Sequence, residues 1–372
     1  MVLSWGDDYP IHQTPEPIAY AGTDRNFYDR YFFNGYAEAG DAAREDRLFA
    51  AAFGVYPHLN IADASFAVIR DGVETALHAS KWLNMERMDL AVGPIRIEVV
   101  RPLQVLKLIV DAPADGIRAE ILFTGRASPI EEPRFTRRFG PRAFMDYTRL
   151  TQNGRYTGWI ELDGKRESVD GFVGTRDRSW GIRPVGARDA QEAVPPQPPQ
   201  FFWLWAPCNF PTGSFFFHTN DDAAGQPWNR RAIWAPDDGT ALEYGHGITL
   251  RITWASGTRH AATATIEIAD PARGLFQLRF EPGQKFFMLG LGYGHPSWGH
   301  GMAHGALSTA REDFKLAELD PRLPQHLHIQ ALSSVTYVSP SGQESHGRGV
   351  LEQLALGPHA PSGFAGLLDV AP

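Results

Sequence analysis

Apolar and polar residues alternate with a period of two along most of the chain from residue 65 onward. Such alternation is typical of β-strands that bury one face. Two of these runs, Ser65–Arg70 and Val73–Ser80, flank the dipeptide Asp71 and Gly72. An Asp-Gly pair between alternating runs favours a type I′ turn, so the pattern predicts a β-hairpin here.

The same pattern recurs throughout both halves of the sequence. Before residue 190 it predicts strands at Ile95–Val100, Leu103–Val110, Ile117–Thr124, Tyr156–Leu162 and Glu167–Gly174. After residue 200 it predicts Phe201–Ala206, Ser214–Thr219, Arg231–Ala235, Ile248–Trp254, Ala261–Ile268, Phe276–Phe280, Phe286–Leu291, Ala306–Ala310, His328–Tyr337 and Gly347–Ala355. Ala42–Gly54 instead has a helical composition. Many short strands separated by turn signals indicate an all-β barrel or sandwich.

A proline-rich segment divides the chain near its middle. Residues 190–200 contain four prolines in eleven positions, which cannot enter the interior of a sheet. A length of 372 residues is also ample for two domains. We therefore expect an N-terminal domain at residues 1–190 and a C-terminal domain at residues 200–372, joined by a linker or ordered crossover.

The most concentrated candidate chemistry lies at the end of the predicted strand Glu167–Gly174. Asp177 stands there between Arg176 and Arg178, with Trp180 three residues later. An apolar wall would raise the pKa of a buried Asp177, whereas adjacent arginines would lower it. In an extended strand the two arginines point to the opposite face from Asp177. Two interpretations therefore stay open: Asp177 is a proton donor, or it belongs to a structural cluster of Arg–Asp ion pairs.

Three motifs carry a family resemblance. They are Arg-Asp-x-Ser-Trp-Gly at Arg176–Gly181, the glycine-rich run Gly292–Gly301, and the run Gly347–Gln353. The first resembles the signature of the carotenoid 1,2-hydratase superfamily, which includes AttH-like proteins, tocopherol cyclase and lipocalin-like Diels–Alderases. The other two resemble its uncharacterised bacterial branch. The resemblance implies two tandem lipocalin-like antiparallel β-barrels and acid–base chemistry at Asp177. Thr175 departs from a tyrosine at that place in the hydratase.

Histidines cluster within and after the second motif, at positions 295, 300 and 304. His300 and His304 have the i,i+4 spacing of a helical metal site, but glycines at 299, 301 and 305 disfavour a helix. We therefore expect no metal. His295 is the predicted catalytic partner of Asp177, as a hydrogen-bonding group or proton shuttle, and His300 is a predicted substrate contact. Loop histidines satisfied by backbone groups remain the alternative.

Aromatic side chains, 12% of the sequence, supply candidate walls for an apolar cavity. The predicted substrate-binding residues are Trp180, Trp203, Trp205, Tyr293 and Trp298, with Arg176 and Arg183 as positioning groups. Core packing explains the aromatic residues equally well. Glu352, in the last predicted strand, is either a second acid or the partner of an arginine such as Arg348.

Charge and missing motifs narrow the function classes. A net charge of −8 argues against nucleic acid as the main partner, because phosphate binding requires a basic face. The single cysteine, Cys208, excludes an intrachain disulfide. The sequence shows no leader pattern and no membrane-spanning apolar run, so we expect a cytoplasmic protein. Phosphate-binding and dinucleotide-binding glycine motifs are absent, so no cofactor is expected.

Together these features predict a cofactor-independent lyase or isomerase, namely a hydratase, dehydratase or cyclase. Its substrate would be a hydrophobic unsaturated molecule such as a terpenoid, polyene or steroid. A non-catalytic carrier of a hydrophobic ligand is the alternative. We also predict that Asp177 and His295 meet in one cleft, beside Pro195–Pro199, although two independent clusters would explain the motifs equally well.

Overall fold

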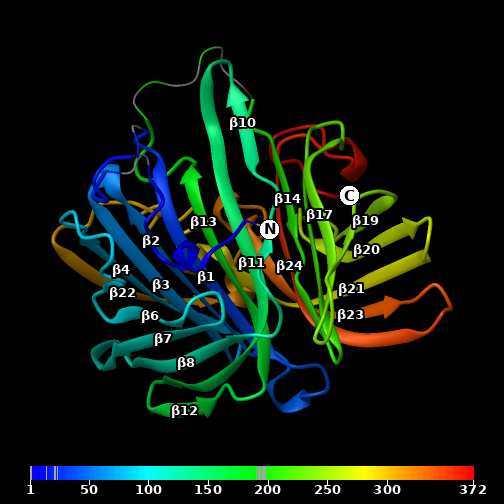
Figure 1. Cartoon of the computed structure of the whole chain (residues 1–372), viewed down its shortest axis with the longest axis horizontal. Coiled ribbons are helices and arrows are strands. Elements are labelled where there is room, and N and C mark those ends of the chain that lie inside the picture. The colour runs from blue at the N-terminus through cyan, green and yellow to red at the C-terminus, as the bar shows by residue number, and fades with distance from the viewer. Residues whose placement is uncertain are drawn as a thin grey trace. The chain divides into compact units, whose positions relative to one another are not determined.

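The computed structural model describes residues 2–13, 15–20, 22, 24–189, 191, 194 and 198–372. The chain forms two compact units that interleave along the sequence (Figure 1). The first unit comprises residues 1–36, 48–197 and 290–314, and the second comprises 37–47, 198–289 and 315–372. Both consist of antiparallel β-strands, which confirms the all-β class and the tandem-barrel architecture. Much of the proline-rich segment lies outside the described residues.

Within the described residues, the sheet of the first unit has fourteen strands in the order β22-β4-β3-β2-β1-β13-β11-β8-β7-β6-β5, with β9, β10 and β12 also paired to β11. These strands are β1 (Phe27–Ala37), β2 (Leu48–Tyr56), β3 (Ile61–Arg70), β4 (Val73–Trp82), β5 (Ala91–Val92), β6 (Ile95–Arg101), β7 (Val105–Ala112), β8 (Ile117–Gly125), β9 (Ile130–Glu131), β10 (Phe135–Phe139), β11 (Arg142–Leu162), β12 (Lys165–Ser168), β13 (Phe172–Ile182) and β22 (Leu307–Lys315).

This sheet curls into a nearly closed barrel, because β5 at one end lies against β3 and β4 near the other. Aromatic rings from strands that are not neighbours meet inside it. Phe33 of β1 approaches Phe123 of β8, with ring centroids 6.5 Å apart, and Phe49 of β2 lies 5.1 Å from Tyr156 of β11. These rings define the inner face of the barrel and form its apolar core.

The second unit contains a ten-stranded sheet in the part of the chain that the structure describes, ordered β18-β17-β16-β14-β24-β23-β21-β20-β19, with β15 paired to β16 and β24. Its strands are β14 (Phe201–Trp205), β15 (Cys208–Phe210), β16 (Gly213–Asp221), β17 (Pro227–Pro236), β18 (Leu242–Tyr244), β19 (Ile248–Trp254), β20 (Ala261–Asp270), β21 (Gly274–Phe287), β23 (Ile329–Val338) and β24 (Glu344–Leu356).

Over the residues described above, helical structure is limited to short 3-10 turns. They are η1 (Trp5–Asp8), η2 (Ala42–Arg44), η3 (Pro57–Leu59), η4 (Pro113–Asp115), η5 (Met288–Leu291), η6 (Leu316–Glu318), η7 (Pro324–His326) and η8 (Ala360–Ser362). Among the described residues, no helix has the length and hydropathy needed to span a membrane.

The predicted hairpin between β3 and β4 is confirmed, since Asp71 and Gly72 both have positive φ angles, of 52° and 77°. The helical interpretation of Ala42–Gly54 is wrong. Only η2 is helical, and β2 occupies Leu48–Tyr56, buried along its whole length. Pairing with β1 and β3 outweighs the helix propensity of its alanines, because burial in the sheet contributes more than propensity.

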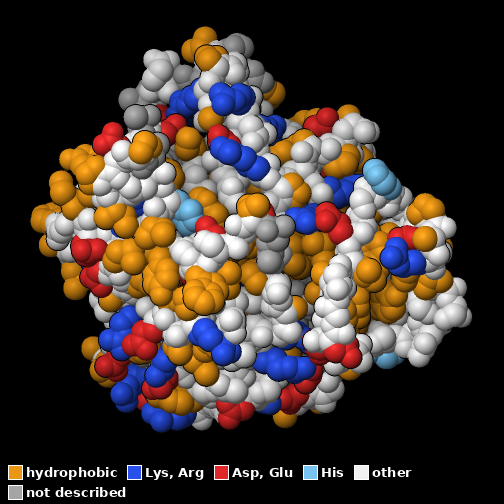
Figure 2. Space-filling model, viewed as in Figure 1, with side chains coloured by type: hydrophobic (Ala, Val, Ile, Leu, Met, Phe, Trp, Pro, Cys, Tyr) orange, Lys and Arg blue, Asp and Glu red, His pale blue; other side chains and the backbone are white. Residues whose placement is uncertain are grey.

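Cations and carboxylates are interspersed on the surface of the first barrel around β7, β8 and β12 (Figure 2). Lys107 pairs with Glu120 across β7 and β8 at 2.5 Å, and Arg118 pairs with Asp111 at 3.0 Å. This part of the surface is therefore a mixed-charge face, which is ordinary for an exposed sheet.

Candidate functional site

A glycine-rich stretch of the chain, residues 290–306, covers the outer face of the first barrel; we call it the cover segment. The Gly301 N–H donates to Asp63 of β3 at 2.6 Å. The Ser80 hydroxyl of β4 donates to the Met302 carbonyl at 3.2 Å. Side chains of the cover segment are therefore held against outward-facing side chains of β1 to β4.

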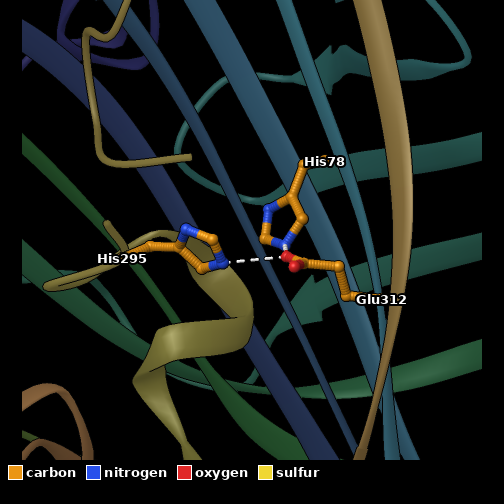
Figure 3. A group of neighbouring side chains, drawn as sticks. All are labelled: His78, His295 and Glu312. Carbon is orange, nitrogen blue, oxygen red and sulfur yellow. Dashed lines mark hydrogen bonds and ion pairs between the residues drawn. The ribbon is translucent and has the colours of Figure 1, made fainter. Parts of the chain in front are cut away.

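One cluster on this face joins two imidazoles to a carboxylate (Figure 3). His78 projects from β4, Glu312 from β22 and His295 from the cover segment. Glu312 Oε2 lies 2.8 Å from His295 Nε2 and 3.2 Å from His78 Nε2. We call these three residues the His–Glu–His group.

Backbone contacts fix the tautomer of His295. Its Nδ1 accepts the N–H groups of Ser297 at 3.1 Å and Trp298 at 2.8 Å. An acceptor nitrogen carries no proton, so the hydrogen of the neutral ring resides on Nε2. His295 therefore donates to Glu312, and the turn formed by residues 295–298 presents an N–H to the carboxylate.

The ionisation states follow from burial and hydrogen bonding. Burial lowers the pKa of His295, so its ring is neutral near pH 7. The close approach of His78 Nε2, and after it that of His295, lowers the pKa of Glu312, which is therefore ionised. His78 is 1% exposed, with Nδ1 3.0 Å from Ser65 Oγ, whereas the Glu312 side chain is 35% exposed. Glu312 is thus an accessible base supported by enclosed imidazoles.

The group also has the composition of a metal site. Its potential ligand atoms all lie within 4.8 Å of one another. A metal-bound histidine offers a lone pair at one nitrogen and normally donates from the other. Nδ1 of His295 is instead an acceptor of two amides, which keeps the proton on Nε2. The donor set therefore suits proton transfer better than metal coordination.

A second cluster lies on the same face. Arg30 of β1 is 1% exposed and donates to the hydroxyls of Tyr293 at 3.2 Å and Tyr56 at 3.0 Å. The Tyr56 hydroxyl in turn donates to Asp63 at 3.0 Å. Tyr56 therefore bridges a buried cation and a carboxylate.

Arg183 and His300 complete this cluster. The Arg183 guanidinium lies over the rings of Tyr28 and Tyr293, 4.9 and 5.6 Å from their centroids. His300 meets the Tyr293 ring edge-on at 4.5 Å. Burial, reinforced by the charge of Arg30, lowers the pKa of His300 to about 3, so this imidazole is neutral. We call this set, Tyr28, Arg30, Tyr56, Asp63, Arg183, Tyr293 and His300, the Arg–Tyr cluster.

The mid-chain motif has two faces, as the strand alternation predicts. Arg176 and Arg178 are fully buried and pair with Asp8 and Asp29, each at 2.5 Å. The pair with Asp8 attaches the N-terminal segment to the barrel, whereas the pair with Asp29 joins β13 to β1. The Trp180 ring stacks on His12 of the N-terminal segment at 3.8 Å. The arginines of the motif therefore have a clear structural role.

Asp177 points to the other face of β13. Its carboxylate lies 4.0 Å from Arg149 Nε, and its side chain is 13% exposed. In the strand order, β13 is separated from β4 by four strand spacings, roughly 19 Å along the sheet. Asp177 and His78 thus lie on strands that are four positions apart in the sheet, and a shared site for Asp177 and His295 stays a prediction.

The predicted residues of the cover segment divide between the two clusters. Tyr293 and His300 join the Arg–Tyr cluster, whereas Trp298 lies beside the His–Glu–His group. The Trp298 ring stacks on His78 at 5.6 Å and on His304 at 3.9 Å. His304 Nε2 bonds the Ser297 carbonyl, whereas His300 contacts Tyr293. The segment between the two histidines is not helical, so they do not share a helix face.

Trp203 and Trp205 lie in the second unit, where both are buried. The Trp203 indole N–H donates to Glu352 at 2.9 Å. Glu352 also binds His328 Nε2 at 2.8 Å and Gln330 Nε2 at 2.7 Å. Burial raises the pKa of Glu352, but these contacts outweigh it and the net shift is downward. They take the place of the predicted pairing with Arg348, which donates to the Glu45 carbonyl.

Sequence reasoning did not find His78, Glu312, Arg30 or Asp63. His78 lies within the predicted strand Val73–Ser80, where nothing distinguishes it from the other residues of that strand. Arg30 lies within a stretch rich in aromatic residues for which no strand was predicted. Glu312 follows the predicted strand Ala306–Ala310 within an Arg-Glu-Asp triplet, which is typical of a solvated surface. Only the pairing of β22 beside β4 indicates that Glu312 and His78 meet.

The fold and the site together define a tandem β-barrel protein with a His–Glu–His group on the outer face of its first barrel. The chain belongs to a family of unknown function, DUF8625, which matches residues 3–365. A search of the curated proteins finds no match.

Solved structures that resemble the chain include the following two. An AttH candidate from Nitrosomonas europaea is 12% identical and has a TM-score of 0.51, with 90% of this chain and 94% of that chain covered. Kievitone hydratase from Nectria haematococca is 12% identical with a TM-score of 0.45, and the coverage is 93% and 98%. The first likeness establishes a shared fold, in agreement with the family resemblance of the sequence.

Proposed function

We propose that this protein is a cofactor-independent acid–base enzyme, a hydro-lyase or isomerase that acts on a hydrophobic unsaturated small molecule. The observation that carries the proposal is the His–Glu–His group. A carboxylate accessible to solvent is held by two imidazoles, one of them fixed in its proton-donating tautomer. Such an arrangement keeps the carboxylate ionised near neutral pH, so that it is free to accept a proton, while it lowers the basicity of that carboxylate.

In dehydration, Glu312 would remove a proton from the carbon next to the hydroxyl-bearing carbon. The carbon–carbon double bond forms as the carbon–oxygen bond breaks, and the protonated Glu312 returns its proton to the departing hydroxide, which leaves as water. Hydration is the reverse, with Glu312 accepting a proton from water. Isomerisation needs only removal of a proton and its return to another carbon. His78 and His295 stabilise the charged form of the base throughout.

Two further features support this class of reaction. Trp298 and Tyr293 supply aromatic surface next to the two clusters, which suits a hydrophobic substrate. The motif at Arg176–Gly181 resembles the signature of a superfamily that includes enzymes that hydrate or cyclise unsaturated molecules. The residues of the proposed reaction nevertheless differ from those predicted first, because Glu312 and His78 replace Asp177 beside His295.

The test is a Glu312→Gln substitution, which keeps the size of the side chain but removes the base. Purified protein would be incubated with terpenoid alcohols, polyenes and steroid enones in ¹⁸O-labelled water, and products analysed by mass spectrometry. For a substrate that wild type converts, we expect the rate to fall by about 10²–10⁴-fold. Glu318→Gln, in an exposed ion pair with Lys315, is the matched control and should retain wild-type activity.

Asp177→Asn tests the sequence-based acid in the same assay. Loss of activity in that variant with full activity in Glu312→Gln would assign the chemistry to Asp177 and refute the role of Glu312. Recovery of a bound apolar molecule that neither wild type nor any variant alters would favour the carrier alternative. Native mass spectrometry of the purified protein provides that measurement.

A further inference from the structure

The Arg–Tyr cluster has an excess of positive charge. It contains two guanidinium groups, Arg30 and Arg183, and one carboxylate, Asp63. The His300 ring is neutral and therefore does not change this balance of charges. Among the described residues, no ion pair links Arg183 to a carboxylate, and its guanidinium contacts the tyrosine rings instead. Even with Asp63 ionised, the cluster therefore carries one surplus positive charge, shared between the buried Arg30 and the half-buried Arg183.

Three buried polar atoms of the cluster also have no hydrogen-bond partner among the described residues: the Tyr28 hydroxyl, Arg30 Nε and His300 Nε2. The His300 side chain is 10% exposed. A buried donor without a partner costs about 1–3 kcal/mol, so proteins seldom retain one without a purpose. In the neutral His300 ring Nδ1 faces the Asp63 carboxylate, so Nε2 is an acceptor and does not attract an anion. The Arg30 Nε–H is a donor, and together with the surplus charge it indicates a complementary anionic group.

We propose that Arg30, Arg183 and Tyr293 bind a carboxylate of the substrate, which is therefore a hydrophobic unsaturated acid. Planar guanidinium groups match the two oxygens of a carboxylate, and a tyrosine hydroxyl adds a further donor. Tyr293 already lies within reach of both arginines. This inference rests on the proposed function, since it identifies the substrate of that same face.

The sheet register places the two clusters at a distance that one substrate can span. Arg30 lies opposite Gly54, Gly54 opposite Asp63, and Asp63 opposite Ser80. His78 occupies the next position on the same face of β4. Strand spacing and rise then separate the Cα atoms of Arg30 and His78 by about 16 Å. A separation of this size is comparable to the length of an extended conjugated chain.

Isothermal titration of the full-length protein with four probes tests the inference. The probes are trans-cinnamate, all-trans-retinoate and the uncharged methyl ester of each. We expect at least one acid to bind wild type about tenfold more tightly than its ester. Arg183→Gln and the conservative Tyr293→Phe should each weaken acid binding about tenfold while leaving ester binding unchanged. Arg118→Gln, on the mixed-charge face, is the matched control and should bind like wild type.

Three results would overturn the inference: equal affinities for acid and ester, no binding of either acid, or unchanged acid binding in Arg183→Gln. Glu312→Gln separates it from the proposed function, because that variant should still bind the acid. Acid binding that depends on Arg183, together with full turnover in Glu312→Gln, would refute the proposed reaction and leave the carboxylate site standing.

Discussion

At the scale of single residues, the ion pair between Asp8 and Arg176 shows how the mid-chain motif contributes to stability. Both side chains are fully enclosed, so each charge depends on the other. Removing one partner of such a pair leaves an uncompensated buried charge. The motif that first suggested catalysis therefore also holds the N-terminal segment on the barrel.

We predict that Asp8→Asn lowers the free energy of unfolding by about 3–5 kcal/mol, because Arg176 then remains buried without a counter-charge. Urea denaturation followed by tryptophan fluorescence measures the change. Asp111→Asn is the matched control, since Asp111 is 63% exposed and its pair with Arg118 contributes at most about 1 kcal/mol. Equal losses in the two variants would contradict this account.

His300 predicts a dependence of stability on pH. Its pKa is about 3 in the fold and near 6.5 in an unfolded chain, so the unfolded state binds more protons at intermediate pH. Stability contributed by the neutral ring is present above the unfolded value and is lost as the pH falls towards the folded value. Between pH 7 and pH 5 this loss amounts to about 2 kcal/mol.

The measurement is urea denaturation at both pH values for wild type and His300→Gln. The variant lacks the titrating ring, so its stability should fall by about 2 kcal/mol less than that of wild type over this interval. Parallel losses in the two proteins would show that His300 is already protonated in the fold or remains accessible to water.

At the scale of elements, Gly54 of β2 makes room for the Arg–Tyr cluster. A Cβ atom at this position would lie 2.4 Å from the Tyr56 hydroxyl. That hydroxyl bridges Arg30 and Asp63 across the face of the sheet. The absence of a side chain at residue 54 is therefore a condition for the bridge.

We predict that Gly54→Ala displaces Tyr56 and lowers the free energy of unfolding by about 1–3 kcal/mol through steric overlap. Gly245→Ala is the control, because a Cβ there meets no atom within 4 Å. Differential scanning calorimetry of both variants checks the expectation. A Gly54→Ala protein as stable as the control would show that Tyr56 moves away at no cost.

At the level of strands, the prediction from sequence was most accurate where apolar and polar residues alternate and turn-forming residues flank the run. The β3–β4 hairpin follows from Asp71 and Gly72, and Ile248–Trp254 is a strand with the predicted bounds. Strand β2 was missed because its residues are buried on both faces, so alternation disappears and alanine suggests a helix. Long strand β11, residues 142–162, was only partly predicted, because its polar first half gave no apolar period.

At the scale of the whole molecule, the class of fold could be predicted from the number of short strands and the motif resemblance. The His–Glu–His group could not, because its members lie on β4, β22 and the cover segment. Their proximity depends on one long-range strand pairing that no local pattern encodes. The arginines of the motif were correctly placed on the face opposite Asp177, since that inference needs only the two-residue period of a strand.

Strand β22 is synthesised long after β4, the strand with which it pairs, and this delay has a consequence during synthesis on the ribosome. Thr75 of β4 hydrogen-bonds Asp313 of β22 at 2.6 Å, although the two are 238 positions apart in the chain. At translation rates of about 5–20 residues per second, roughly 12–48 s separate the emergence of these partners. Throughout that interval the β4 edge has no β22 beside it, and an unpaired edge is the usual starting point of aggregation. The nascent protein thus passes through a period in which a chaperone that shields β-edges would benefit it most.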